Sequence, residues 1–449
     1  MTDETRILAE YVASTTFESL PPEVPTRAKD LVIDLFGSIV RARAESESTP
    51  SLLGMLSTLN LDGAGSCSVP GDSRTYTPAI AALLNGALGH SLDFDDTHAE
   101  SSLHPSAPVV PAAFAAGQQV GASGKDVLNA IVAGYEVCCR IGNALDPSAH
   151  YARGFHPTAT AGVFGAAAAV ARLYTLSAEE ICSAFGIAAS QGAGSLQFLL
   201  NGAWNKRYQV GAAAMNGVIA ATLAKRGFRG AIEALEGEHG FLRAHSDNAA
   251  PARLIENLGQ RYETMRIGVK PYPSCRYTHA ALDGLIELRQ VLRLEEFVRV
   301  EIGLHQNGIV LTSSPLEQKR RPRSIVDAQF SMPFVAAVAM HRGSFGWDDY
   351  VLVGDERIES LAQRVEVKRD PRVEGALHPF GATLRVRTPS DCIERIIRDP
   401  AGEPDSFPDK LRTRQKFIAL SAPILRERAS NLFDVLYGLD EVQDMRHCM

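Results

Sequence analysis

The chain has 449 residues, of which 45% are apolar, so it can bury a sizeable core and is long enough for two domains. Its net charge of −7, with basic residues dispersed along the chain, argues against nucleic-acid binding. The chain does not open with a basic segment followed by an apolar one, and no apolar run reaches the length of a membrane span. We therefore expect a soluble, cytoplasmic protein.

Helical spacing of apolar residues dominates the first 265 residues. It predicts helices at 6–13, 25–43, 51–59, 78–90, 107–117, 125–145, 156–174, 177–190, 209–226 and 230–236. Pro25 suits a first helical turn, and Ser177 with Glu180 forms a capping box. Because many of these helices are rich in Ala and Gly, their axes can approach closely. The pattern predicts an all-helical domain over residues 1–267.

The pattern changes near residue 268. Alternation of apolar and polar residues predicts strands at 297–304, 364–368 and 382–387, with helices at 277–291, 327–341 and 357–364. Helical spacing then resumes at 408–420 and 424–437. The expected fold class is mainly α: the large helical domain, a smaller α+β domain at 268–400, and C-terminal helices at 401–449 that return to the helical domain.

Residues 91–111 concentrate ionisable groups within apolar surroundings. This stretch contains no Lys or Arg but carries Asp93, Asp95, Asp96, Thr97, His98 and His104. Such groups need partners from elsewhere in the fold, or a ligand. Carboxylates and imidazoles also bind divalent metals, but their spacing here matches no specific metal motif. We prefer Asp93 as the partner of a nearby His or Lys, and interpret Asp95 and Asp96 as structural.

Three later segments also place polar groups at helix edges: GFHPTATAG, NGAWNKRYQVG and VKPYPSCRYTH. His156 could satisfy a helix N-terminus or act in catalysis. Lys206 and Arg207 could form an exposed pair or hold a substrate carboxylate. Cys275 reads as a small buried hydrophobe, and the seven scattered cysteines without a CxxC pair indicate reduced thiols. The Gly-rich segments lack the strand and spacing of an NAD or FAD site.

Together these segments resemble the MmgE/PrpD family over nearly the whole chain. The motifs, in order, are LDFDDTH, LHPSAPVVPAA, GFHPTATAG, GAWNKR, KPYPSCRYTHAALD and DAQFSMPF. The family includes 2-methylcitrate dehydratase, cis-aconitate decarboxylase and iminodisuccinate epimerase, and the overall likeness is greatest to the epimerase. The resemblance implies a helical domain, an α+β lid domain, a homodimer, and a site between the domains that uses no cofactor or metal.

The resemblance also implies the site residues. The expected catalytic groups are His104, His156, Lys206, Lys270 and Asp93. We expect Thr97, Arg207 and Cys275 to contact the substrate. Two positions depart from the family pattern: Phe334 in FSMPF is often a Tyr in relatives, and Cys275 stands about where some members carry a His.

The expected activity is epimerisation of iminodisuccinate or a related amino dicarboxylate, by proton transfer at the carbon beside a carboxylate. Cations next to that carbon stabilise the developing negative charge, and groups with adjustable pKa values move the proton. A lyase of the 2-methylcitrate dehydratase or cis-aconitate decarboxylase type is the alternative. A relative that binds polycarboxylates without transforming them, and a metal-dependent enzyme, are the remaining ones. We expect a small di- or tricarboxylate substrate and no nucleic-acid or membrane partner.

Overall fold

The computed structural model describes residues 3–63, 65–373 and 379–448, and these form two compact units. The larger unit comprises residues 1–91, 95–269 and 408–449, and the smaller unit comprises residues 92–94 and 270–407. The fold is mainly α, as predicted. Residues 92–94, expected in the helical domain, belong to the smaller unit. The other crossings between the units lie at residues 269/270 and 407/408, against expected boundaries at 267/268 and 400/401.

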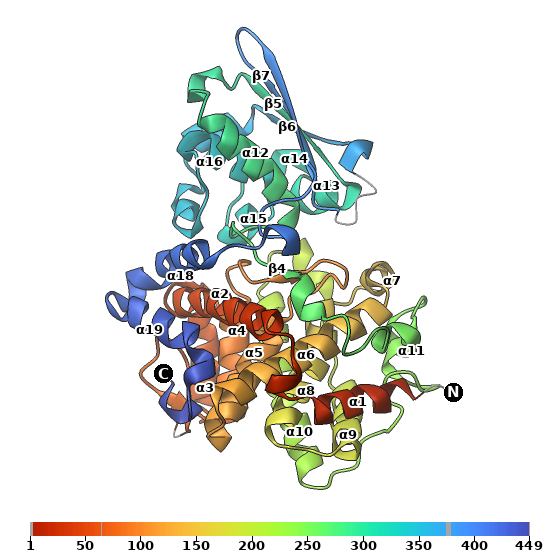
Figure 1. Ribbon diagram of the computed structural model, residues 1–449. Coiled ribbons are helices and arrows are strands. Elements are labelled where there is room, and N and C mark those ends of the chain that lie inside the picture. The colour runs from red at the N-terminus through yellow and green to blue at the C-terminus, as the bar shows by residue number, and fades with distance from the viewer. Residues whose placement is uncertain (1–2, 64, 374–378, 449) are drawn as a thin grey trace. The chain divides into compact units, whose positions relative to one another are not determined.

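The larger unit is built from helices and two short strand pairs (Figure 1). Its helices are α1 (Glu4–Ser14), α2 (Glu23–Glu45), α3 (Thr49–Thr58), α4 (Pro78–Gly89), α5 (Ser106–Val120), α6 (Gly124–Ala144), α7 (Pro147–Ala152), α8 (Pro157–Leu173), α9 (Ala178–Ala189), α10 (Asn205–Lys225), α11 (Phe241–His245), α18 (Lys410–Leu425) and α19 (Arg428–Tyr437). The strand pairs are β1 (Cys67–Ser68) with β2 (Thr75–Tyr76), and β3 (Thr97–His98) with β4 (Ile267–Gly268), both antiparallel. The C-terminal helices α18 and α19 both pack on α2 within this unit.

Helix α10 packs against both α4 and α8, and small residues make these contacts close. A Cβ on Gly211 would lie 2.3 Å from the Leu83 carbonyl oxygen of α4. A Cβ on Gly217 would lie 2.4 Å from Ala166 Cβ of α8. The Ala- and Gly-rich composition therefore lets three helix backbones meet, and it sets the spacing of the helix ends that carry the polar segments.

Gly211→Ala is expected to destabilise the protein by about 1–3 kcal/mol, because the added methyl group forces α10 away from α4. The matched control is Gly54→Ala in the exposed part of α3, where a Cβ would meet nothing within 4 Å. That change should stabilise by about 0.4–1 kcal/mol, through reduced freedom of the unfolded chain. Urea denaturation of both variants measures the difference, and equal shifts would contradict the close packing.

The smaller unit contains a four-stranded sheet of order β6-β5-β7-β8. The strands are β5 (Arg299–Leu304), β6 (Val365–Arg369), β7 (Ala382–Arg387) and β8 (Cys392–Ile397). Strand β5 is parallel to β6 and antiparallel to β7, which is antiparallel to β8. The helices are α12 (His279–Arg289), α13 (Gln306–Thr312), α14 (Leu316–Lys319), α15 (Ile325–Gln329), α16 (Met332–Arg342) and α17 (Glu356–Ala362). Helix α12 packs on β7 and β8, and α16 packs on β6, which gives the α+β arrangement.

Several local predictions were wrong. Residues 230–236 form turns rather than a helix, and glycines at 230, 237 and 240 lower the helix propensity there. The helices expected at 327–341 and 424–437 are interrupted, the second at Arg426, whose φ of 55° ends α18. Strand β8 was missed because it is largely exposed and shows no clean alternation. Within the described ranges, no helix is both long and apolar enough to cross a membrane.

Candidate active site

Three histidine rings meet in the larger unit, each at the end of a helix. His90 is the residue that follows α4, His104 precedes α5, and His156 is the residue immediately before α8. The ring centroids of His90 and His104 are 5.0 Å apart, and those of His90 and His156 are 5.6 Å apart. We call these three residues the histidine cluster. The predicted residues His104 and His156 thus gather around His90, which was not predicted.

Acceptors near His90 and His104 fix the protonated nitrogen of both rings. His90 Nδ1 lies 2.6 Å from Asp95 Oδ2, and His104 Nδ1 lies 2.5 Å from the Asp96 carbonyl oxygen. Because a carbonyl oxygen and a carboxylate oxygen accept hydrogen bonds, Nδ1 is the donor in each ring. The lone pair of each neutral ring is therefore on Nε2, the nitrogen that can exchange a proton with another group.

The rings of the histidine cluster differ in burial, and burial affects both their pKa values and their accessibility to a small molecule. His156 is buried, whereas His104 is only partly buried. Burial, together with the charges of His90 and Lys206, holds the pKa of His156 well below its ordinary value. His156 is therefore neutral at neutral pH. His104 is the more accessible of these two rings for a bound small molecule.

Thr97 and Lys206, both predicted site residues, lie near the cluster. Thr97 Oγ1 is 3.5 Å from His104 Nδ1. Lys206 is half-buried in the first turn of α10, and its charge acts on His156. An ammonium group beside imidazoles of adjustable protonation is suited to hold a carboxylate close to a site of proton transfer.

Arg207 is buried, and its guanidinium contacts hydroxyl groups of the larger unit. Its Nη1 donates to Ser46 Oγ at 3.1 Å and to Ser48 Oγ at 3.0 Å. These bonds join α10 to the turn between α2 and α3. They give Arg207 a structural role, and its contact with a substrate stays a prediction.

The smaller unit contains the predicted pair of Asp93 and Lys270. Lys270 Nζ lies 3.2 Å from Asp93 Oδ2 and donates to the Asp93 carbonyl oxygen at 2.9 Å, and both residues are buried. The backbone of Asp93 has a φ of 53°, a left-handed conformation that Asp tolerates better than most residues. Asp93 thus pairs with a lysine. In the same unit Cys275 is buried, and its backbone N–H donates to the Gln329 carbonyl oxygen at 2.9 Å.

Asp95 was interpreted as structural, but it is the carboxylate of the histidine cluster. Its Oδ2 is 2.6 Å from His90 Nδ1 and 3.8 Å from His104 Nδ1. Asp96 fits the structural interpretation, since its carboxyl group accepts bonds from the backbone N–H and hydroxyl of Ser106. Burial and the nearby Asp95 carboxylate raise the pKa of Asp96 well above its usual range. Three aspartates within four residues of sequence carry no signal that separates these roles.

A separate group of His98, Glu100 and Glu263 in the larger unit has metal-ligand chemistry. Their ligand atoms lie within 4.8 Å of one another. However, Arg261 Nη2 is 2.8 Å from Glu263, and Arg266 Nη2 is 2.9 Å from Glu100. Burial acts to raise the pKa of Glu263, but bonds with His98 and Arg261 hold it at about 2. Arginines therefore pair with these carboxylates, and the group is a partly buried ion-pair network.

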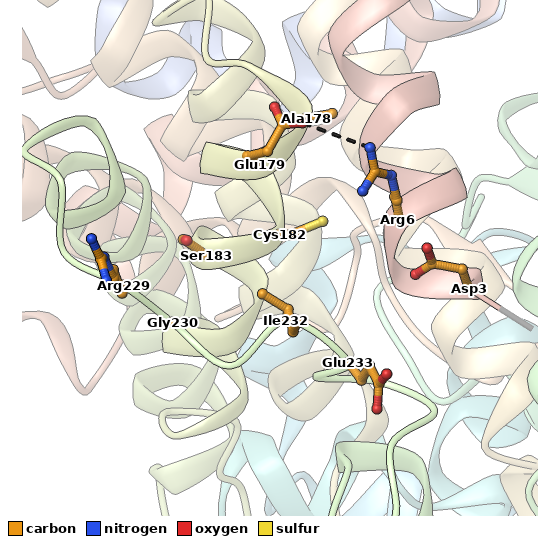
Figure 2. Close-up of a pocket in the computed structure, with 10 residues that line it drawn as sticks. All are labelled: Asp3, Arg6, Ala178, Glu179, Cys182, Ser183, Arg229, Gly230, Ile232 and Glu233. Carbon is orange, nitrogen blue, oxygen red and sulfur yellow. Dashed lines mark ion pairs between the residues drawn. The ribbon is translucent and has the colours of Figure 1, made fainter. Parts of the chain in front are cut away.

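A hollow elsewhere on the larger unit contains none of the predicted site residues. Arg6 of α1 and Glu179 of α9 lie on its lining, as Figure 2 shows. Their side chains form an ion pair of 3.7 Å. Cys182 and Ser183 of α9 also line it, together with residues of the segment that follows α10. Both charged partners are mostly exposed, so this pair contributes little stability and the hollow lacks the buried polar groups of the histidine cluster.

His150 is a buried histidine outside the cluster and makes stability depend on pH. Burial lowers its pKa to about 4, and its two ring nitrogens contact the His245 carbonyl oxygen and Thr160 Oγ1. Between the ordinary histidine pKa of about 6.5 and the folded value, the unfolded chain binds the extra proton. The stability that His150 contributes is therefore fully present above about pH 6.5, the ordinary histidine pKa. It is lost as the pH decreases through the range between that value and the folded pKa, by at most about 1.4 kcal/mol per pH unit.

This predicts that the wild-type protein loses more stability between pH 7 and pH 5 than His150→Gln does. Thermal unfolding of both proteins across this interval measures the difference, and titration of other groups cancels in the comparison. Parallel pH profiles would contradict a neutral, buried His150.

Comparisons with known proteins agree over both units. Residues 6–254 match the MmgE/PrpD N-terminal domain, and residues 272–436 match the MmgE/PrpD C-terminal domain. The chain is 27% identical to the cis-aconitate decarboxylase-like protein oryM of Aspergillus oryzae, over 98% of this chain and 95% of that protein. It is 26% identical to cis-aconitate decarboxylase of Aspergillus terreus, over 98% and 93%. The human cis-aconitate decarboxylase is 28% identical, over 82% of this chain and 78% of the human protein.

Proposed function

Because the chain belongs to the MmgE/PrpD family, we propose that it is an enzyme that transfers a proton at a carbon beside a carboxylate of a small di- or tricarboxylate. The observation that carries this proposal is the histidine cluster. Its rings are held with Nδ1 as the donor to a protein acceptor, so Nε2 is the nitrogen that can give or take a proton. Lys206 supplies positive charge to the same group.

The relatives favour a lyase that acts on cis-aconitate or a similar tricarboxylate. In such a decarboxylation the bond to one carboxyl carbon breaks and CO₂ leaves. The electron pair shifts through the double bond, and one proton is taken up at the carbon beside another carboxylate. His104 is our choice for the proton donor, because it is more exposed than the neutral His156. Lys206 holds a carboxylate, and Thr97 positions His104 or the substrate.

Epimerisation of iminodisuccinate is the second candidate, and the named relatives do not support it. Two departures from the family pattern weaken the transfer of a decarboxylase or dehydratase mechanism in detail, and this keeps the epimerase as an alternative. Phe334 is a buried aromatic ring without a hydroxyl group at a position that is often a tyrosine in relatives, and Cys275 is a buried thiol about where some members carry a histidine. Epimerisation removes a proton from one face of the carbon and returns one to the other, and neighbouring imidazoles can share these steps.

A substrate panel tests the proposal. We expect CO₂ release from cis-aconitate and no release from a heat-inactivated sample. Interconversion of single iminodisuccinate stereoisomers without CO₂ would assign the epimerase, and water loss from 2-methylcitrate would assign the dehydratase. Binding of these acids without turnover would contradict catalysis and support a polycarboxylate-binding protein. Activity that disappears on thorough chelation and returns with a divalent metal would support the metal-dependent alternative.

Other parts of the proposal rest on the family resemblance. We propose that Lys270 and Asp93 act in the same reaction, that Cys275 contacts the substrate, and that no cofactor or metal takes part. A homodimeric assembly and a cytoplasmic location are further predictions, which size-exclusion chromatography with light scattering and cell fractionation test directly.

A further inference from the structure

The amide of Gln209 orients His156. We propose that Gln209 is a positioning residue that holds His156 in the tautomer with the proton on Nδ1. The Nε2 atom is then the ring nitrogen that can accept a proton as a base or, once protonated, donate it as an acid. The significance of this for catalysis rests on the proposed function. The geometry itself belongs to the larger unit and can be measured without a substrate.

The orientation of the amide follows from its two contacts. Gln209 Nε2 donates to the Ser195 carbonyl oxygen at 3.0 Å, and Gln209 Oε1 lies 3.2 Å from His156 Nδ1. A carbonyl oxygen only accepts, so the NH₂ end of the amide must face Ser195. The oxygen end then faces His156, and Nδ1 must be the donor. The backbone of residue 195 therefore determines which nitrogen of residue 156 carries the proton.

The same backbone segment also holds His156 directly. The His156 backbone N–H donates to the Gly194 carbonyl oxygen at 2.9 Å, and Phe155 forms an antiparallel bridge with Ser195. A Cβ on Gly194 would lie 2.7 Å from Ala159 Cβ and 3.1 Å from Gln209 Oε1. Glycine at this position leaves room for the amide to reach the ring, so residues 194 and 195 set both the backbone and the side chain of His156.

Charged groups near His156 set its protonation state, so it matters that the Gln209 amide is neutral. The cationic or titratable groups His90 and Lys206 favour the neutral ring, and Asp95 favours the charged ring. Phe198 contributes only an aromatic edge, with ring centroids 5.7 Å apart. A carboxylate in place of the Gln209 amide would keep an acceptor at Nδ1 but add a negative charge there, and would stabilise the imidazolium.

The variants Gln209→Glu and Gln209→Leu separate the effect of charge at residue 209 from that of the hydrogen bond to Nδ1. Both are studied by NMR in protein labelled with ¹⁵N at histidine, and the His156 signals are assigned by their loss in His156→Gln. We expect wild type to show protonated Nδ1 and unprotonated Nε2 at neutral pH. Gln209→Glu should keep this tautomer and move the His156 titration to higher pH. Gln209→Leu should give a mixture of both tautomers. The matched control is Gln197→Glu, which adds the same charge on an exposed residue of the nearby segment and should leave the His156 signals unchanged.

The histidine spectra test the role of Gln209 without any substrate being converted. Protonated Nδ1 as the only tautomer in Gln209→Leu, or a His156 titration that does not move in Gln209→Glu, would overturn it. With a substrate that the enzyme converts, the Gln209→Leu variant should show a kcat lowered by roughly 10- to 100-fold and little change in KM. Gln209→Glu should shift to higher pH the limb of the kcat profile that reports His156. Absence of turnover with every substrate would contradict the proposed function but leave the spectroscopic result valid.

Discussion

Replacement of His104 by glutamine is expected to lower kcat by roughly 10²- to 10⁴-fold, the range typical of a lost general acid or base. The His104 imidazole donates from Nδ1 to the Asp96 carbonyl oxygen and is more exposed than His156. Glutamine can keep a hydrogen bond to that carbonyl but cannot exchange a proton near neutral pH. Steady-state kinetics with the substrate found in the panel measure the effect.

The control for His104 is His239→Gln, because His239 is exposed and lies in a turn outside the histidine cluster. This variant should keep wild-type kcat and KM. Both variants should unfold at nearly the wild-type temperature. Full activity in His104→Gln would remove His104 from the mechanism, and a large loss of thermal stability would instead indicate a structural role.

Lys270→Met is expected to destabilise the smaller unit by about 3–5 kcal/mol, the usual cost of removing one member of a buried ion pair. Its ammonium group lies 3.2 Å from the Asp93 carboxylate, and both side chains are almost inaccessible to solvent. Without Lys270 the buried Asp93 carboxylate loses this ammonium group as a partner. Denaturant unfolding followed by probes in the smaller unit measures the loss.

The double variant Asp93→Asn with Lys270→Met tests whether the charge itself is responsible. Removal of both charges should recover part of the stability lost in Lys270→Met, since no uncompensated carboxylate remains. Lys368→Met is the exposed comparison: Lys368 pairs with Glu301 but is 47% exposed, so its loss should cost less than about 1 kcal/mol. Equal losses in Lys270→Met and Lys368→Met would contradict a buried, coupled pair.

Sequence periodicity predicted most of the larger unit because its helices bury apolar residues at regular spacing. The capping box at Ser177 and Pro25 in the first turn of α2 mark helix starts that the structure contains. Periodicity failed where local backbone geometry decides the outcome. The positive φ of Arg426 and the turns at 230–236 depend on close packing and on glycine, and neither leaves a helical or alternating pattern.

The candidate site shows a similar division. Motifs identified His104, His156 and Lys206, and the structure places all three around one group of rings. His90 and Asp95 were missed, because nothing in the order of residues distinguishes an aspartate that bonds a histidine ring from its neighbours. Gln209 was missed because it lies 53 residues from His156 in sequence, and only the fold of α8 and α10 brings the two together.

The most direct test of proton transfer by the histidine cluster is turnover in D₂O, with the product analysed by NMR. We predict that wild-type product carries one deuterium at the carbon beside a carboxylate, and that His104→Gln forms this labelled product at a rate reduced in proportion to its kcat. Product without solvent deuterium at that carbon, or labelled product formed by His104→Gln at the wild-type rate, would contradict the assignment of proton transfer to this cluster.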